Sequence, residues 1–154
     1  MKWSLEMQKP IEAIAKKQGI DLYTVQPGDL CIKIKVKGYM ELVIEKIAKN
    51  QISVAHYFEQ NGDLCVDPEI VFLIAPGYDR DYKKVTRWYP ISFGQPPIMG
   101  GIASLNFSGY EEYVVEWDYK GNPARYYARR QADCATFSNM WGRNLRAQGF
   151  VKAA

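Results

Sequence analysis

Residues 52–75, ISVAHYFEQNGDLCVDPEIVFLIA, decide how the rest of the chain is arranged. Two apolar runs flank Asn61-Gly62, and this dipeptide between such runs is the strongest short-range signal for a β-hairpin. Asp67-Pro68 interrupts the second run, and a proline within a strand indicates an edge position or a bulge. The run from Ile70 to Ala75 is apolar on both faces, which predicts a central strand covered by a helix. We therefore expect the other elements to pack around this hairpin.

The flanking segments alternate in the manner of antiparallel strands. Leu30 to Val36 places an apolar side chain at every second position and polar or small ones between them, as in a half-buried strand. Pro90 indicates a further edge or bulge. Lys120-Gly121-Asn122 predicts the turn of a second hairpin. Further strands are predicted over residues 42–47, 52–58, 85–93, 110–119 and 124–130.

A helix is predicted at each end of the chain. Residues 3–18 carry apolar side chains at helical spacing, with Ser4 as a candidate N-cap; Pro10 leaves open a shorter helix over 10–18. Asp133 is the candidate N-cap of the second helix, and Gly149 is expected to end it. Its apolar stripe comprises Cys134, Phe137, Trp141 and Leu145.

This order of elements predicts one domain over residues 1–154. The fold class is α+β: a meandering antiparallel β-sheet of about six to eight strands, with an N-terminal and a C-terminal helix packed on it.

Cysteine usage and hydropathy favour a cytoplasmic protein. Cys31, Cys65 and Cys134 are widely spaced and none lies in a CxxC motif, which fits a reducing compartment without structural zinc. The sequence shows neither the apolar core of a signal peptide nor a run long enough to span a membrane. Its net charge of +3 is too small to indicate nucleic acid by itself.

Few catalytic arrangements are compatible with the sequence. His56 is the single histidine, and it alternates in phase with Val54 and Phe58, which favours a core position over a catalytic one. Gly100-Gly101 lacks the residues of a phosphate-binding loop. We therefore expect no enzyme and no cofactor. The weak alternatives are a metal site at Asp63, Asp67 and Glu69, and a hydrolase or nuclease using Asp67, Glu69 and His56.

Charge is distributed unevenly in the last third of the chain. Residues 110–119 carry four carboxylates and no cation, whereas residues 120–154 carry seven Lys or Arg and one Asp. Two interpretations remain open: neighbouring strands of complementary charge, or a basic surface for nucleic acid or an acidic partner. The candidate contacts are Arg125, Tyr127, Arg129, Arg130, Arg143 and Arg146.

Residues 94–109, GQPPIMGGIASLNFSG, combine four Gly and two Pro with apolar side chains. A loop of this length in a compact domain is often functional, although residues 102–107 also fit a short strand. The candidate partner-binding residues are Pro97, Ile98, Met99, Ile102, Leu105 and Phe107.

Three segments together resemble a known family: HYFEQNGDLCVDPEIVF (56–72), WYPISF (88–93) and FSNMWGRNLRAQGF (137–150). The family is a domain of unknown function carried by plasmids, integrative elements and phages. Against its pattern, residues 94–109 look inserted. The resemblance implies an accessory protein of a mobile element in the bacterial cytoplasm, and it carries over no catalytic residue.

Two functions follow as hypotheses. The first is a non-catalytic protein that binds a protein partner, for example an inhibitor of a host defence system of the anti-CRISPR or anti-restriction type; its abundant Tyr and Trp suit an interface. The second is a nucleic-acid-binding accessory protein that uses the basic C-terminal region.

Overall fold

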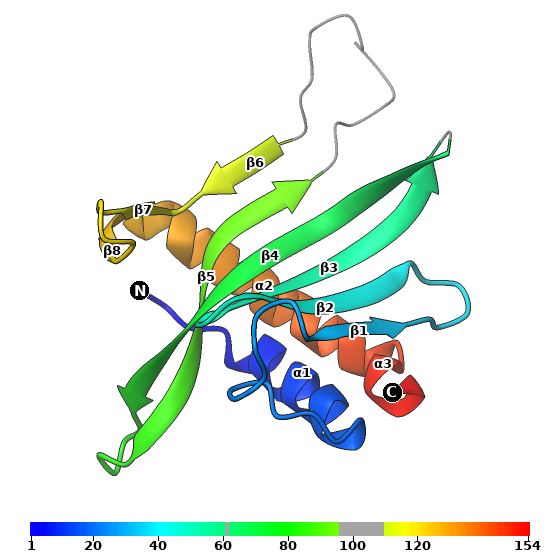
Figure 1. Ribbon diagram of the computed structural model, residues 1–154, viewed down its shortest axis with the longest axis horizontal. Coiled ribbons are helices and arrows are strands. Elements are labelled where there is room, and N and C mark those ends of the chain that lie inside the picture. Colours follow the sequence, from blue (N-terminus) through cyan, green and yellow to red (C-terminus); the bar gives the residue numbers. More distant parts are fainter. Residues whose placement is uncertain (61, 96–109) are drawn as a thin grey trace, which may run out of the picture.

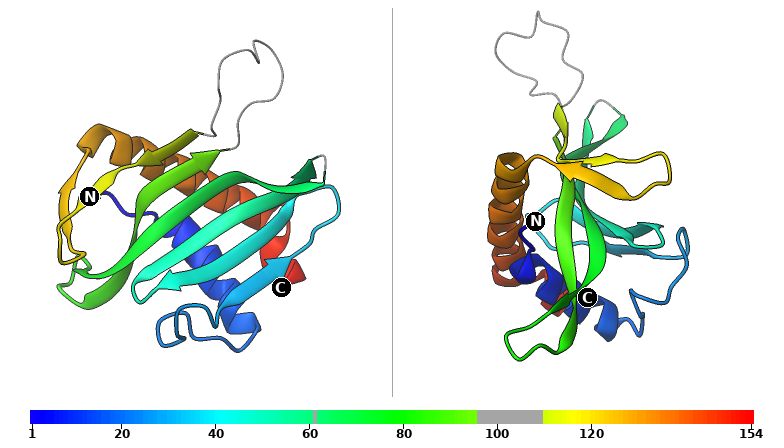
Figure 2. Two further views of the ribbon diagram at one scale, coloured as in Figure 1. Left: turned by 45° about the horizontal axis from the view of Figure 1, so that its top comes forward. Right: turned by 90° about the vertical axis from the view of Figure 1, so that its left-hand side faces the viewer.

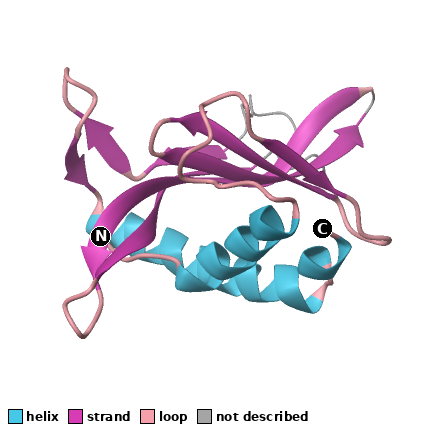
Figure 3. Ribbon diagram, turned by 60° about the horizontal axis from the view of Figure 1, so that its bottom comes forward, coloured by secondary structure: helices cyan, strands magenta, loops and turns pink. Residues whose placement is uncertain are grey.

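The computed structural model describes residues 1–60, 62–95 and 110–154. An antiparallel sheet forms one layer, and the helices cover one face of it (Figure 1, Figure 3). In chain order the elements are α1 (Leu5–Lys17), β1 (Cys31–Ile34), β2 (Glu41–Ala48), β3 (Gln51–Gln60), β4 (Asp63–Tyr78), β5 (Lys84–Gln95), β6 (Tyr110–Tyr113), β7 (Val115–Trp117), β8 (Pro123–Tyr126), α2 (Ala128–Ala147) and α3 (Phe150–Ala153). The predicted α+β class is confirmed.

The main sheet is a meander. Among the described residues it has six strands in the order β1-β2-β3-β4-β5-β6, each antiparallel to the next, and β7 and β8 form a separate two-stranded sheet. β3 and β4 pair from Gln60↔Asp63 onward, which confirms the hairpin predicted over residues 52–75. This hairpin lies in the middle of the sheet, as expected.

The core lies between the sheet and the helices. Five neighbouring strands each supply at least one side chain that is at most 2% exposed, including Ile32, Ile44, Val54, Phe72 and Trp88. Complete burial of one such side chain is worth about 1.5–3 kcal/mol. The alternation of apolar and polar residues along the strands therefore decides which face meets the helices.

The opposite face of β4 is also partly covered. Val71 and Leu73 pack against Ile91, Val114 and Val115. The prediction of a central strand with two apolar faces is confirmed, but only one of those faces meets helices. The other is covered in part by the chain that follows β6.

Pro68 and Pro90 both lie at bulges, one of the two positions predicted for them. Ala55 pairs with Glu69 and Tyr57 with Val66, so His56 alone faces Asp67 and Pro68. A second shift in register lies opposite the Val71–Phe72 step, next to Pro90 in β5. At such a position the missing N–H of proline interrupts no ladder bond.

The alternative of a shorter first helix over residues 10–18 is wrong. Helix α1 starts at Leu5 and continues through Pro10. Ser4 occupies the N-cap position without making a side-chain capping bond. The cap comes from α2 instead, because Asn139 Oδ1 accepts a 2.9 Å hydrogen bond from the Glu6 amide.

Helices α1 and α2 cross closely at Gly142. A Cβ atom at this position would lie 2.1 Å from the Glu6 carbonyl oxygen and 2.6 Å from Met7 Cα, far inside contact distance. Pro10 has no N–H to donate to the carbonyl of Glu6, four residues earlier. The backbone of α2 at Gly142 therefore packs against the Glu6 carbonyl, which receives no hydrogen bond from residue 10 of α1.

Two further predictions in the last third of the chain are wrong. The strand expected over 110–119 breaks at Val114, because Val114 and Val115 are both buried and strict alternation cannot bury two successive residues on one face. The strand expected over 124–130 ends at Tyr126, and α2 begins at Ala128. Asp133 is consequently inside the helix and is not its N-cap.

The remaining features of the C-terminal helix are as predicted. Cys134, Trp141 and Leu145 are buried, and Phe137 packs against the same core. Gly149, at φ 89°, separates α2 from α3.

We expect Gly142→Ala to destabilise the fold by about 2–4 kcal/mol, because the new methyl group would collide with the backbone of α1. Urea denaturation measures the change. Asn144→Ala, on the exposed side of the same helix, is the control and should cost little. Equal stability of wild type and Gly142→Ala would show that the two helices do not cross as described.

Candidate functional site

Between β6 and α2 the chain forms a small projecting unit. We call residues 115–130 the aromatic hairpin; it comprises β7, β8 and the first turn of α2. It leaves the main sheet after β6 and projects on the side of the sheet opposite the helices (Figure 2, right). Few of its residues take part in the core.

The base of the aromatic hairpin is firmly attached. Val114 and Val115 are 0% and 3% exposed. The Val114 amide donates to the Ile91 carbonyl, and the Tyr127 amide donates to the Val114 carbonyl, both at 3.0 Å. Val114, the residue before the hairpin, therefore connects both strands of the hairpin to β5.

The tip is closed by Asp118. Its carboxylate accepts hydrogen bonds from the backbone amides of Asn122 at 2.8 Å and Lys120 at 2.9 Å. These bonds, that of Asn122 first, lower the pKa of Asp118. Because they form within the turn, the tip keeps its shape without support from the core.

Beyond the base, every residue from 116 to 130 except the half-buried Asp118 is exposed. All residues from 121 to 130 are exposed, and the aromatic side chains are among them or just before them. The exposed fractions are 38% for Trp117, 93% for Tyr119, 46% for Tyr126 and 41% for Tyr127. Large aromatic side chains are normally at least partly covered, so their concentration on one short unit is unusual for a purely structural element.

The charges of the hairpin are partly neutralised within it. Glu116 pairs with Arg125 across the two strands, at 3.9 Å, and accepts a hydrogen bond from the Tyr127 hydroxyl. That hydrogen bond raises the pKa of Tyr127. Arg130 lies over the Tyr127 ring, 5.1 Å from its centre. The prediction that Arg125 faces an acidic strand is confirmed for Glu116.

The five candidate arginines do not form one patch. Arg125, Arg129 and Arg130 lie at the hairpin. Arg143 and Arg146 lie on the last turns of α2, about 20–25 Å further along a helix that rises about 1.5 Å per residue. Arg146 pairs with Glu6 of α1. Arg129 and Arg130 belong to α2 and not to the strand predicted over residues 124–130.

The candidate loop lies outside the described residues. Its members are Pro97, Ile98, Met99, Ile102, Leu105 and Phe107.

His56 belongs to the core. It is 6% exposed, and its ring packs against Trp141 and Phe150 with centroids 5.3 Å away in each case. Nδ1 lies 3.4 Å from the Glu41 carbonyl oxygen. Burial lowers the pKa of His56. This environment matches a core histidine, as its phase in the strand predicted.

The alternative of a metal site at Asp63, Asp67 and Glu69 is not supported by the positions of these side chains. Asp63 is at the exposed end of β4, and Glu69 accepts a 2.5 Å hydrogen bond from Ser53. Within the described ranges, no group of three His, Cys, Asp or Glu side chains is placed to hold a metal ion. Asp63, Asp67 and Glu69 are therefore not brought together.

Sequence reasoning identified the basic half of the site and missed the aromatic half. Arg125, Tyr127 and Arg130 were singled out, whereas Trp117, Tyr119 and Tyr126 were not. The available signal was composition, because residues 115–130 contain four aromatic side chains together with four cations. It was hidden because residues 110–119 were interpreted as a strand of the main sheet.

Fold and site together define a small α+β protein with a meandering sheet, a single helical layer and a projecting aromatic hairpin. The chain belongs to the family described as "Domain of unknown function (DUF6908)", whose model matches residues 9–151. The family resemblance inferred from the motifs is thus confirmed. No curated protein and no solved structure matches the chain. No helix in the described part is long and apolar enough to cross a membrane.

His56 should make stability depend on pH between about 5 and 7. Burial lowers its pKa in the folded state, so on acidification the unfolded state binds the proton first, below about 6.5, and the free energy of unfolding falls. The slope cannot exceed about 1.4 kcal/mol per pH unit. We expect this slope in wild type and its loss in His56→Gln, measured by urea denaturation. If the free energies of unfolding of wild type and His56→Gln differ by the same amount at every pH in this range, His56 is not the group responsible.

Proposed function

We propose that this chain is a non-catalytic binding protein that engages an acidic protein partner through the aromatic hairpin. The observation that carries this proposal is the exposure of Trp117, Tyr119, Tyr126 and Tyr127 on an anchored unit that gives little to the core. An element needed only to connect β6 with α2 has no reason to present four aromatic rings to solvent.

The chemistry of the hairpin suits a protein interface. Trp, Tyr and Arg are enriched among the interface residues whose truncation costs about 2 kcal/mol or more. The closed turn at Asp118 and the Glu116–Arg125 pair hold these side chains in place before binding. Less conformational entropy is then lost when the complex forms.

An acidic partner follows from the charges. Residues 115–130 carry four cations and two carboxylates. Both carboxylates are engaged inside the hairpin, Glu116 with Arg125 and Asp118 with the turn. Cations such as Lys120 and Arg129 remain at the exposed surface, where complementary charge on a partner favours association.

Nucleic acid remains the alternative, because exposed rings with cations also bind single strands by stacking. The separation of Arg143 and Arg146 from the hairpin, and the pairing of Arg146 with Glu6, favour the protein partner. A groove that follows a phosphate backbone would need a continuous row of cations.

Inhibition of a host defence system is the form of this function that the resemblance to mobile-element proteins suggests. In that form the partner is a bacterial defence protein, and the hairpin covers one of its surfaces. The proposal places the action in the bacterial cytoplasm.

The aromatic hairpin should be necessary for partner binding. We expect Trp117→Ser/Tyr119→Ser/Tyr126→Ser to lose a partner that wild type captures from a nuclease-treated bacterial lysate. The control is Tyr78→Ser/Tyr82→Ser, which removes two exposed tyrosines, 62% and 87% exposed, from the far end of the β4–β5 hairpin. Captured proteins are identified by mass spectrometry, and affinity for the purified partner is then measured.

Capture of the same proteins by wild type, the triple variant and the control variant would contradict the proposal. The nucleic-acid alternative is tested in parallel with a mixed single-stranded oligonucleotide. Binding that falls steeply with salt and is lost in the triple variant would replace the protein partner with nucleic acid.

A further inference from the structure

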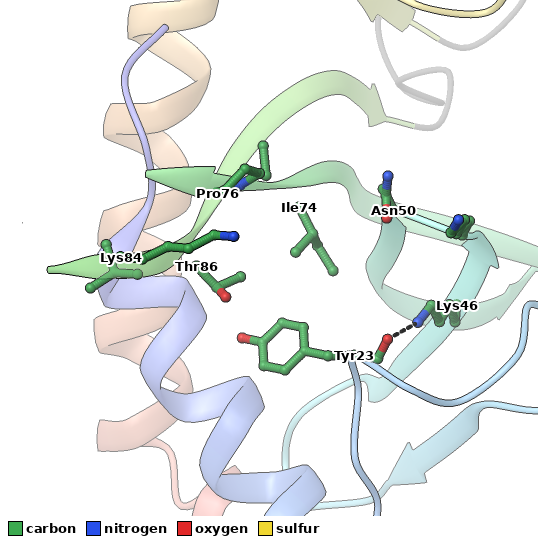
Figure 4. Close-up of a pocket in the computed structure, with 10 residues that line it drawn as sticks. Tyr23, Lys46, Asn50, Ile74, Pro76, Lys84 and Thr86 are labelled. Carbon is green, nitrogen blue, oxygen red and sulfur yellow. Dashed lines mark hydrogen bonds between the residues drawn. The ribbon is translucent and has the colours of Figure 1, made fainter. Parts of the chain in front are cut away.

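A pocket of about 480 Å³ lies far from the aromatic hairpin. It is bounded by the chain after α1, by the β2–β3 turn and by the paired ends of β4 and β5 (Figure 4). Its apolar wall includes Ile74, Pro76 and Val85. The volume is within the range of small-molecule sites, about 300–1,000 Å³.

The ring of Tyr23 forms part of this pocket and is held in place. Its hydroxyl donates to the Glu12 carboxylate and accepts a 3.2 Å hydrogen bond from Trp88 Nε1. Burial raises the pKa of Tyr23, with Glu12 adding to the effect. Figure 4 shows the ring facing Ile74 and Thr86. A flat ligand would therefore meet a preformed aromatic surface.

Three lysines line the same pocket. Lys46 is 2% exposed, and its ammonium donates to the carbonyls of Leu22 at 2.9 Å and Tyr23 at 3.2 Å. An ammonium has three N–H donors, so the third has no protein acceptor among the described residues. Burial lowers the pKa of Lys46, and Asp21 partly opposes this.

Lys49, in the β2–β3 turn, and Lys84, the first residue of β5, also line the pocket. Lys84 reaches toward its centre (Figure 4). Within the described part of the chain, neither forms an ion pair. The lining contains no carboxylate. The lining thus combines three cations with an apolar wall, and the nearest carboxylate that acts on them, Asp21 beside Lys46, lies outside the pocket lining. This excess of positive charge favours a negatively charged occupant.

We propose that this pocket binds a small organic anion, with a flat apolar body against Tyr23 and Ile74 and a phosphate or carboxylate group among Lys46, Lys49 and Lys84. The side chains of Asn50 and Thr86 also line the pocket and supply uncharged hydrogen-bonding groups. This site is separate from the aromatic hairpin, so either proposal stands if the other fails.

Three probes separate the sources of the charge: phenyl phosphate, benzoate and inorganic phosphate. We expect phenyl phosphate or benzoate to bind more tightly than inorganic phosphate, because only they offer a ring to Tyr23. The tighter of the two identifies the preferred anionic group. Dissociation constants come from NMR titration, with shifts expected at the amides of Ile74 and Val85.

The lysines are tested with a matched control. Lys49→Gln and Lys84→Gln should each weaken binding by about fivefold or more, as expected for one lost charge near the surface. Lys83→Gln removes the same charge from the neighbouring residue, which does not line the pocket, and should leave affinity unchanged. All three positions are exposed, so the fold should tolerate the changes.

Absence of saturable binding for all three probes would overturn the proposal. So would equal affinity for inorganic phosphate and the two ring-bearing anions. An equal loss in Lys83→Gln and Lys84→Gln would show non-specific attraction to the basic surface and would also overturn it.

Discussion

The close contact between α2 and the first turn of α1 determines how the helical layer is built. Gly142 lets the two backbones touch at Glu6, and Pro10 leaves the Glu6 carbonyl without its usual donor. Around the same point Asn139 caps α1 and Arg146 pairs with Glu6. Residues about 135 positions apart in sequence thus provide the hydrogen bond that caps α1 and the ion pair between the two helices. The two helices therefore present one surface on which the sheet packs.

This arrangement also explains why the aromatic hairpin exists at its position. β6 ends at the edge of the sheet, while α2 starts in the helical layer, so the chain must pass from one layer to the other. Val114 makes the passage possible because it bonds to Ile91 on one side and to Tyr127 on the other. A short loop would satisfy this connection. The chain instead forms a closed hairpin with exposed rings. Because the connection between β6 and α2 does not need such a hairpin, we assign the function to it.

The sequence predicted the meander and its core well, because alternation reports directly which side chains face the helices. It failed where tertiary contacts override the local pattern. Val114 and Val115 are both buried, and this breaks the strand that the sequence predicts as continuous over residues 110–119. Helix α2 starts at Ala128 without a capping side chain, so the sequence carries no signal for its beginning. Lys46 carried an overlooked signal, since it shares the phase of Leu42 and Ile44, and a lysine on the buried phase needs acceptors. The pocket itself was not predictable, because its residues come from separate segments that only the fold assembles.

The charge of the C-terminal third gives a misleading picture of the surface. Seven Lys or Arg against one Asp in residues 120–154 suggest a basic tail, yet Arg125 pairs with Glu116 and Arg146 with Glu6, both from outside that segment. The remaining cations form two groups: Lys120, Arg129 and Arg130 at the hairpin, and Arg143 and Lys152 near the C-terminal end of α2 and in α3. The two groups are farther apart than the Debye length of about 8 Å at physiological salt, so they cannot act as one field that steers a partner from a distance. Recognition at the aromatic hairpin must then depend on short-range contact of rings and guanidinium groups, where exact fit contributes more than net charge.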